Sequence, residues 1–484
     1  MTEEDAVEVV RRLKAGTDVG TIVKNVRDGN LLMQLSLTPE TTRQFELPYL
    51  AKMPSHLFVE GNPYMNSRLF RAVSSSTSHT NAENRQLTAE FLAEARRLWD
   101  LEPVEEPYIT TIQAALALSQ TYIINGLDKL STFFLEQAIK MGQHMHLFDS
   151  SSNGKMKDTR MAKAGIHTAW KTFSWQAMLA YSYLRAPLLK DPPQIPLPDM
   201  ELDPQWYGET WVQYPHDQNL TALCLGHHMK AEAELFTIFN ELSYLCFGRP
   251  SRSLITSEIL SLKGKFDAWK AALPGTLQPG ALVLPHSFSL HFRYHQAMIG
   301  LMQLPLADSS DAVVDSGIGA EETPKAIIRS LEVKLEFLMR LYYMRHSFVN
   351  HSPWLIYPMA RLGNHANELL EGGSDEDPGK LDGYRSTIIL CAKALESQAH
   401  NFHVATSLGI QLHSIVKPEM LQLLQTYVKA VDVESAEEEM VAHHPHSQWP
   451  IPIINLGDDP EKARVDRLIE GFKGTHLQSG AVKV

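Results

Sequence analysis

The sequence predicts an all-α protein. Apolar residues recur at three- and four-residue intervals in one segment after another from residue 63 onward, which is the spacing of one helix face. The alternation of apolar and polar residues that is typical of strands never extends over a long stretch. No period of about 34 or 40 residues is apparent, which argues against a solenoid. The expected fold is a large multi-helix domain.

Residues 1–62 are predicted to form a helical arm or linker. Ala6, Val9, Val10 and Leu13 lie at helical intervals behind Thr2, which can cap a helix. Prolines at positions 39, 48 and 54 and the turn sequence at 61–63 interrupt regular structure farther on. The arm is therefore expected to lie outside the core.

Helices are expected in close succession after the arm. The first has an apolar face from Phe91 to Trp99, and the second, which includes residues 112–119, ends near Gly126. The third is expected over 127–147, with Phe133 and Phe134 on its apolar side. So short a break between the second and third helices predicts an antiparallel hairpin. Further helices are predicted over residues 160–184, 217–247, 256–272, 284–304, 324–349, 354–370 and 381–408.

Segments of other composition separate these helices. Prolines crowd residues 192–199, which cannot form the interior of a helix. Residues 307–323 and 371–379 are small, acidic and glycine-containing, which is typical of flexible segments. The predicted organisation is an arm (1–62), a core (63–305), a flexible loop (306–323), the C-terminal helical part of the same domain (324–431) and an acidic tail (432–484).

The charge balance argues against direct DNA binding by this chain. Its 484 residues include 44 basic and 56 acidic residues, which give a formal net charge of -12. A protein that grips nucleic acid normally shows a basic excess or a basic stripe, because it must neutralise phosphates. No long run of Lys and Arg is present in this sequence.

Cysteine usage and hydropathy indicate a soluble intracellular protein. Cys224, Cys246 and Cys391 are widely separated, so neither a disulfide framework nor a thiolate zinc site is expected. The acidic N-terminus does not resemble a signal peptide. Apolar stretches such as 109–124 are shorter than the roughly 20 residues that cross a bilayer, so no membrane association is expected.

The 21 histidines raise the question of a metal site. His291 and His295 stand four positions apart, a spacing that suits two zinc ligands. In zinc proteases Glu follows the first histidine, but here Phe292 does, and no third ligand is identifiable. We expect a core or hydrogen-bonding role for both residues. The other neighbouring histidines are also interpreted as structural, or as solvated in the tail with a weak metal site as the alternative: His144, His146, His227, His228, His400 and His403, and in the tail His443, His444 and His446.

No motif in the sequence indicates catalysis. The nucleophile pattern G-x-S-x-G and the phosphate-binding patterns of nucleotide enzymes are absent. An all-α terpene cyclase would need facing Asp-rich motifs, whereas the one adjacent pair, Asp458 and Asp459, stands in the irregular tail. We therefore expect no enzymatic activity and no cofactor in this chain.

Several short motifs follow one another between residues 62 and 198. They are TIQAALALS at 111–119, EQAIKMG at 136–142 before HLF at 146–148, a helix led by Arg160 with FSWQ at 173–176, YLRAP at 183–187 and IPLP at 195–198. This ordered set resembles the middle-homology region of fungal zinc-cluster (Zn2Cys6) transcription factors, of the nitrate-assimilation and xylanolytic-activator type. WKAALP at 269–274 and SLHFRYH at 289–295 are also similar to helices of that region. The motif residues expected to build the structure are Gln113, Trp170, Phe173, Trp175, Pro187, Pro196 and Pro198.

Two features depart from the family pattern. The corner that reads Gly-Arg-Pro in the family is Arg185-Ala186-Pro187 here, which puts a role of that Gly or Arg in doubt. The six-cysteine module that binds two zinc ions and contacts DNA has no counterpart among the three scattered cysteines. Zinc is therefore expected only in that missing module, and DNA contact only through it or through another chain.

The resemblance implies a regulatory domain for transcription, located in the nucleus or shared between nucleus and cytoplasm. Its implied partners are co-regulator proteins or the transcription machinery, with a homodimer and a small-molecule inducer left open. Acidic and apolar residues mix in the tail, which resembles an activation segment, with a merely solvated tail as the alternative. The alternative function is an all-α enzyme or a cytoplasmic helical scaffold unrelated to transcription.

Overall fold

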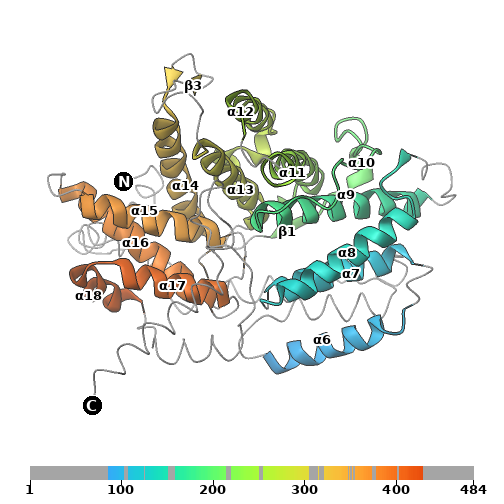
Figure 1. Ribbon diagram of the computed structural model, residues 1–484, viewed down its shortest axis with the longest axis horizontal. Helices are drawn as coiled ribbons and strands as arrows, with labels where there is room; N and C mark the ends of the chain where they lie inside the picture. Colours follow the sequence, from blue (N-terminus) through green and yellow to red (C-terminus); the bar gives the residue numbers. More distant parts are fainter. Residues whose placement is uncertain are drawn as a thin grey trace.

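The periodic segments of the sequence fold into helices, which confirms the all-α class (Figure 1). The computed structural model describes the following residues: 85–102, 107–124, 126–150, 159–213, 220–249, 254–304, 314–315, 321–346, 348, 352, 355–372, 378–399 and 403–428. The predicted arm, the acidic tail with its three histidines, and Asp458-Asp459 lie outside the described residues.

Within the part of the chain that the structure describes, the first helices are α6 (Arg85–Trp99), α7 (Ile109–Ile124) and α8 (Asp128–His144). Helices α7 and α8 pack side by side as the expected hairpin (Figure 1). Gly126 closes the turn with φ +69°, a left-handed conformation that favours glycine, and Leu127 N donates to Tyr122 O at 2.9 Å. Phe133 does not face the core as predicted, because 46% of its surface is exposed while its neighbour Phe134 is buried.

The long helix α9 (Thr159–Ser182) lies against α7, α8 and α11. An irregular segment follows and leads to the single turn of α10 (Pro204–Tyr207), where the Asp203 side chain caps Trp206 N at 3.2 Å. Strands β1 (Trp211–Gln213) and β2 (Leu220–Ala222) then pair antiparallel, with Trp211 opposite Ala222.

The predicted helix over 217–247 starts later than expected. Residues 220–222 belong to β2, and α11 runs over Leu225–Phe247. Cys224 precedes the helix with φ +52°, a left-handed conformation from which a right-handed helix cannot continue backward. The pairing with β1 therefore overrides the helical spacing of the apolar residues in this segment.

The middle of the molecule is built by α11, α12 (Thr256–Ala271) and α13 (Pro285–Met302), with short 3₁₀ turns η4 (Gly275–Leu277) and η5 (Pro279–Ala281) between the last two. Helix α13 is buried on nearly every side, including Ser289, His291 and Arg293. Its polar residues must therefore find partners inside the protein.

The C-terminal group consists of α14 (Pro324–His346), α15 (Ile356–Gly372), α16 (Pro378–Ala399), α17 (His403–Ile415) and α18 (Pro418–Tyr427). Two strands of two residues each, β3 (Val314–Asp315) and β4 (Glu321–Glu322), pair antiparallel before α14 within the predicted loop. The helix predicted over 381–408 is instead two helices. At the end of α16, Ser397 and Gln398 donate to Phe348 O at 2.9 and 2.6 Å, contacts with a distant segment that helical periodicity does not reveal.

One contiguous hydrophobic core joins these groups, from Ala95 in α6 to Val428 after α18. The helices α6–α9, α11–α13 and α14–α18 follow one another across the molecule (Figure 1). None of the helices among the described residues combines the length and the apolar character that a membrane span requires.

Candidate functional site

The motif residues on α7 and α9 meet across the helix interface. Gln113 on α7 donates from Nε2 to Thr168 Oγ1 on α9 at 2.9 Å. Six residues farther along α7, Trp175 of α9 donates from its indole Nε1 to Ser119 Oγ at 2.9 Å. Ser119 in turn lies 3.0 Å from Ser131 Oγ on α8, and both serines are buried. These contacts fix α9 in register against the α7–α8 hairpin.

Trp170 and Phe173 connect the same helix to the segment that leaves it. Trp170 Nε1 donates to Ile195 O at 2.9 Å, so the IPLP motif is tied to the middle of α9. Phe173 is fully buried, and its ring meets the Trp170 ring edge-on, with centroids 6.0 Å apart. As predicted, Phe173 lies in the core, while Trp170 and Trp175 are partly buried beside it.

The three motif prolines lie along the exit segment. Pro187 starts it, and Pro196 and Pro198 flank its end, where Tyr207 OH donates to Pro198 O at 2.5 Å. Prolines favour an extended chain and leave no backbone N–H that would need an acceptor. Pro196 is exposed, so the structure gives it no packing role among the described residues.

Two amides clamp the start of the exit segment. Gln176 Oε1 accepts from Leu188 N and Leu189 N at 3.0 and 3.2 Å, and Gln176 Nε2 donates to Asn240 Oδ1 on α11 at 2.7 Å. Asn240 Nδ2 donates to Lys190 O at 2.8 Å. Gln176 stands in the FSWQ motif, but no pattern in the sequence singles out Asn240, because its partners lie 50 or more positions away.

Arg185, which occupies the altered corner, contacts the hairpin. Its guanidinium donates to Thr132 Oγ1 on α8 at 3.2 Å and lies over the Tyr183 ring, 5.3 Å from the centroid. The departure from the Gly-Arg-Pro pattern is therefore accommodated by a contact between α8 and the end of α9.

A partly buried ion cluster lies beside these motifs, at the junction of α9, α11 and α13. Glu232 of α11 pairs with Lys171 of α9 and with Arg293 of α13, the latter at 3.1 Å. Burial alone would raise the pKa of the Glu232 carboxyl, but the two cations outweigh it and hold that pKa well below its usual range. The carboxylate therefore stays charged and joins three helices. Sequence reasoning missed this cluster, because its members are 61 positions apart.

Histidines surround the ion cluster in their neutral form. His228, one turn before Glu232, meets the His286 ring edge-on at 4.7 Å, and His286 Nε2 donates to Leu223 O at 3.0 Å. His167 stacks on Trp206 at 4.4 Å. Burial lowers the pKa of His228 to about 3 and that of His167 to about 4. Each is therefore uncharged at neutral pH and packs as an aromatic ring.

His291 and His295 lie in the core, in agreement with the interpretation from the sequence. His291 Nε2 donates to Leu277 O, and His295 Nδ1 donates to His291 O, both at 2.7 Å. Burial lowers the pKa of His295 to about 3. His144 and His146 are exposed instead, so neither has the role in the core that a structural histidine would have.

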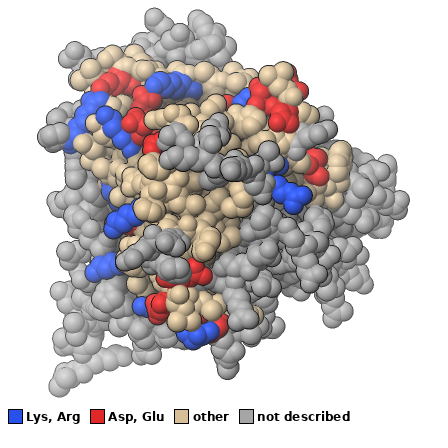
Figure 2. Space-filling model, turned by 90° about the vertical axis from the view of Figure 1, so that its right-hand side faces the viewer, with Lys and Arg blue, Asp and Glu red and all other residues tan. Residues whose placement is uncertain are grey.

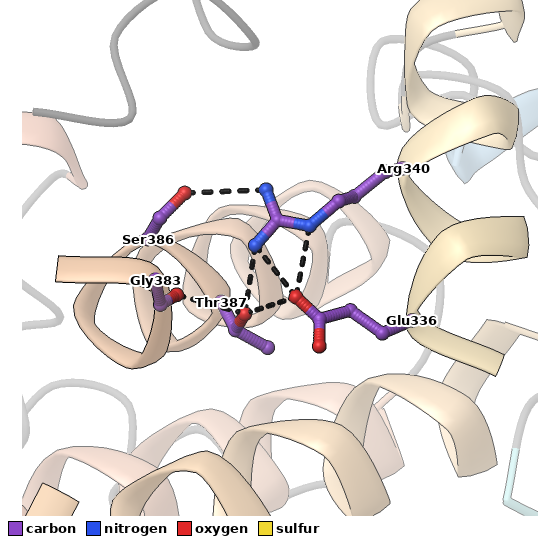
Figure 3. Close-up of polar contacts among 5 residues, drawn as sticks. All are labelled: Glu336, Arg340, Gly383, Ser386 and Thr387. Atoms are coloured by element: carbon purple, nitrogen blue, oxygen red, sulfur yellow. Dashed lines mark hydrogen bonds and ion pairs between the residues drawn. The ribbon is translucent and has the colours of Figure 1, made fainter. Parts of the chain in front are cut away.

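A second polar cluster joins α14 to α16 (Figure 3). Arg340 donates to Glu336 Oε1 from Nε and from one terminal nitrogen, at 2.9 and 2.7 Å. The guanidinium also reaches Thr387 Oγ1 at 2.8 Å and Ser386 Oγ at 3.2 Å. Thr387 in turn donates to Glu336 at 2.6 Å. One turn earlier on α14, Glu332 accepts from Arg361 Nε of α15 at 3.0 Å and lies 2.9 Å from His365 Nε2. Both carboxylates of this part of α14 are thus engaged with neighbouring helices.

The polar groups of these clusters bind one another and the backbone. Within the described residues, no three His, Cys, Asp or Glu side chains gather into a group that could hold a metal ion. Burial raises the pKa of the Cys246 thiol to about 12 and also raises that of Cys391, so both stay protonated. On the face drawn in Figure 2, basic and acidic side chains of the described residues alternate around a largely uncharged centre. The arrangement is suited to fixing helices relative to one another.

Comparison with known proteins gives no match: no family model, no curated protein and no solved structure is significantly similar to the chain. The likeness to the middle-homology region therefore rests on the motifs and their order.

Proposed function

We propose that the chain is a regulatory domain for transcription that acts through protein partners and reaches DNA only through another polypeptide or a zinc cluster. The proposal rests on the resemblance of the ordered motifs to the fungal middle-homology region.

The observation that supports it best is the contact between motifs that are far apart in the sequence. TIQAALALS meets the FSWQ helix through Gln113–Thr168 and Ser119–Trp175, and that helix meets IPLP through Trp170–Ile195. These contacts bring residues of the separate motifs together, which supports the interpretation of the motifs as parts of one region. Their convergence is what a shared regional architecture requires.

The test is to tether the whole chain to a heterologous DNA-binding domain in a fungal reporter strain. Reporter output should differ severalfold, upward or downward, from that of the DNA-binding domain alone. A matched fusion that carries Trp170→Ala should lose the effect, since the substitution removes the contact between two motifs. A Lys129→Ala fusion is the control, because Lys129 is exposed on α8 and belongs to none of the motifs.

Unchanged reporter output from a fusion that accumulates in the nucleus at the level of the control would contradict the proposal. An unchanged effect in the Trp170→Ala fusion would also contradict it, since the effect would then not depend on the motif contacts.

A further inference from the structure

The exposed face of α14 carries a stripe of basic and apolar side chains. Lys325, Arg329, Val333 and Phe337 follow one another at intervals of four, so they form one row along the helix, and Lys334 lies beside it. The three cations are exposed, as is 63% of the Val333 surface and 36% of the Phe337 surface. The row extends over about 18 Å, or three helical turns.

The charge of this stripe has no partner within the described residues. Lys325, Arg329 and Lys334 form no ion pair there. The acidic side chains of the same helix are unable to compensate them, because Glu332 is engaged with α15 and Glu336 turns toward Arg340 and Thr387 (Figure 3). Lys334 and Lys270 of α12 also repel each other, and this repulsion adds to the burial that lowers the pKa of Lys270.

We propose that this stripe, formed by Lys325, Arg329, Val333, Lys334 and Phe337, docks an acidic amphipathic helix of a partner protein. The acids of such a helix would pair with the three cations, and its apolar side chains would cover Val333 and Phe337. Single exposed apolar residues are common, but here they adjoin three cations that form no ion pair within the described residues, and this combination indicates the chemistry of the partner.

Charge complementarity supports this occupant. The chain as a whole has a formal net charge of -12, so its overall field repels an acidic segment, whereas the three cations of this stripe attract it locally. The phosphates of a nucleic acid could also pair with the three cations, but they would leave the apolar side chains Val333 and Phe337 uncovered. The inference goes beyond the proposed function, because the surface would bind an acidic helix whatever process the chain serves.

The test is a binding titration of the full-length chain with a labelled synthetic helix that has Glu at every fourth position beside a row of Leu. Saturable binding that weakens as salt rises is expected. The variant Lys325→Glu/Arg329→Glu/Lys334→Glu should raise the Kd by roughly tenfold or more. Val333→Ser/Phe337→Ser should also weaken binding but keep its salt dependence.

The matched control reverses two exposed cations on α8, Lys129→Glu/Lys140→Glu, and should leave the Kd unchanged. Equal weakening by the control, or no weakening by the α14 variants in folded protein, would overturn the assignment. Tighter peptide binding by the tail variant Glu437→Gln/Glu438→Gln/Glu439→Gln would also overturn it, since the chain's own acidic segment would then be the occupant. If the chain bound random duplex DNA and the α14 variant abolished that binding, the occupant of the stripe would be a nucleic acid and not a protein helix.

Discussion

Trp175 of α9 donates its indole hydrogen to Ser119 of α7 at 2.9 Å, across 56 positions of sequence. The same serine lies 3.0 Å from Ser131 of α8, so one indole nitrogen is linked to both helices of the hairpin. The ring itself packs against the hydrophobic core. The hydrogen bond and the packing of Trp175 can therefore be separated by substitution.

Trp175→Phe should destabilise the protein by about 1 kcal/mol, because the ring packing is largely kept while buried Ser119 loses a donor. The measurement is the free energy of unfolding from urea titrations. Ser119→Ala, which removes the acceptor, should cost a similar amount, and the double variant should cost less than both together. Strict additivity would show that the two side chains do not interact.

Trp170→Ala should be the more severe change, at about 3 kcal/mol, since it removes a large ring and the tie to Ile195 O. Trp170→Phe keeps part of the packing and should lose about 1 kcal/mol. Limited proteolysis should then cut the exit segment around residues 190–198 faster in both variants. A loss below about 1 kcal/mol for Trp170→Ala would contradict the packing of this corner.

Glu232→Gln should destabilise the protein by about 3 kcal/mol, because buried Arg293 would lose its carboxylate. The double variant Glu232→Gln/Arg293→Met should recover part of that loss, since no uncompensated charge remains buried. Urea unfolding at neutral pH measures both. If the single variant were as stable as the parent, the ion cluster would not hold the three helices together.

Stability should fall as the pH drops from about 7 toward 5. Burial lowers the pKa values of His228, His295 and His346 to about 3 and that of His167 to about 4, from an ordinary value of 6.5. The unfolded chain takes up a proton on each histidine below pH 6.5, whereas the folded chain does so only near its lowered pKa. Each histidine thus favours unfolding by up to about 1.4 kcal/mol per pH unit in this window.

Urea titrations at several pH values test this dependence. His295→Gln should reduce the slope of stability against pH, because it removes one of the four groups. The lowered pKa of Glu232 acts in the same direction at more acidic pH: its contribution is present above about 4.5 and is lost as the pH falls toward the folded value. Stability that stays constant between pH 7 and 5 would contradict the burial of neutral histidines.

The sequence predicts local structure better than it predicts contacts. The spacing of apolar residues and the Asn125-Gly126 stop are enough to locate α7, α8 and their hairpin. The same spacing failed at residues 220–224, where pairing with β1 and the left-handed Cys224 displace the helix, and beyond Ala399, since distant contacts lie at the end of α16.

The sequence indicated some of the residues that organise the site but not the contacts that they make. Trp170, Trp175 and Gln113 stand in motifs, so they could be singled out, although their partners could not. Asn240 and Glu232 belong to no motif, and Arg293 was not singled out within SLHFRYH, because their roles depend on partners 50 to 64 positions away that only the folded chain brings together.

Whether the chain acts through partners rather than through its own contact with DNA is tested most directly by titrating it against random and promoter-derived duplexes at about 150 mM salt. A fusion that carries a zinc cluster serves as the positive control. The net charge of -12 predicts no sequence-selective binding by the bare chain, and affinity weaker than the 10⁻⁴–10⁻⁶ M that is typical of non-specific binding by DNA-binding proteins. Tight, sequence-selective binding by the bare chain would contradict the proposed function and would require a DNA-reading surface of its own.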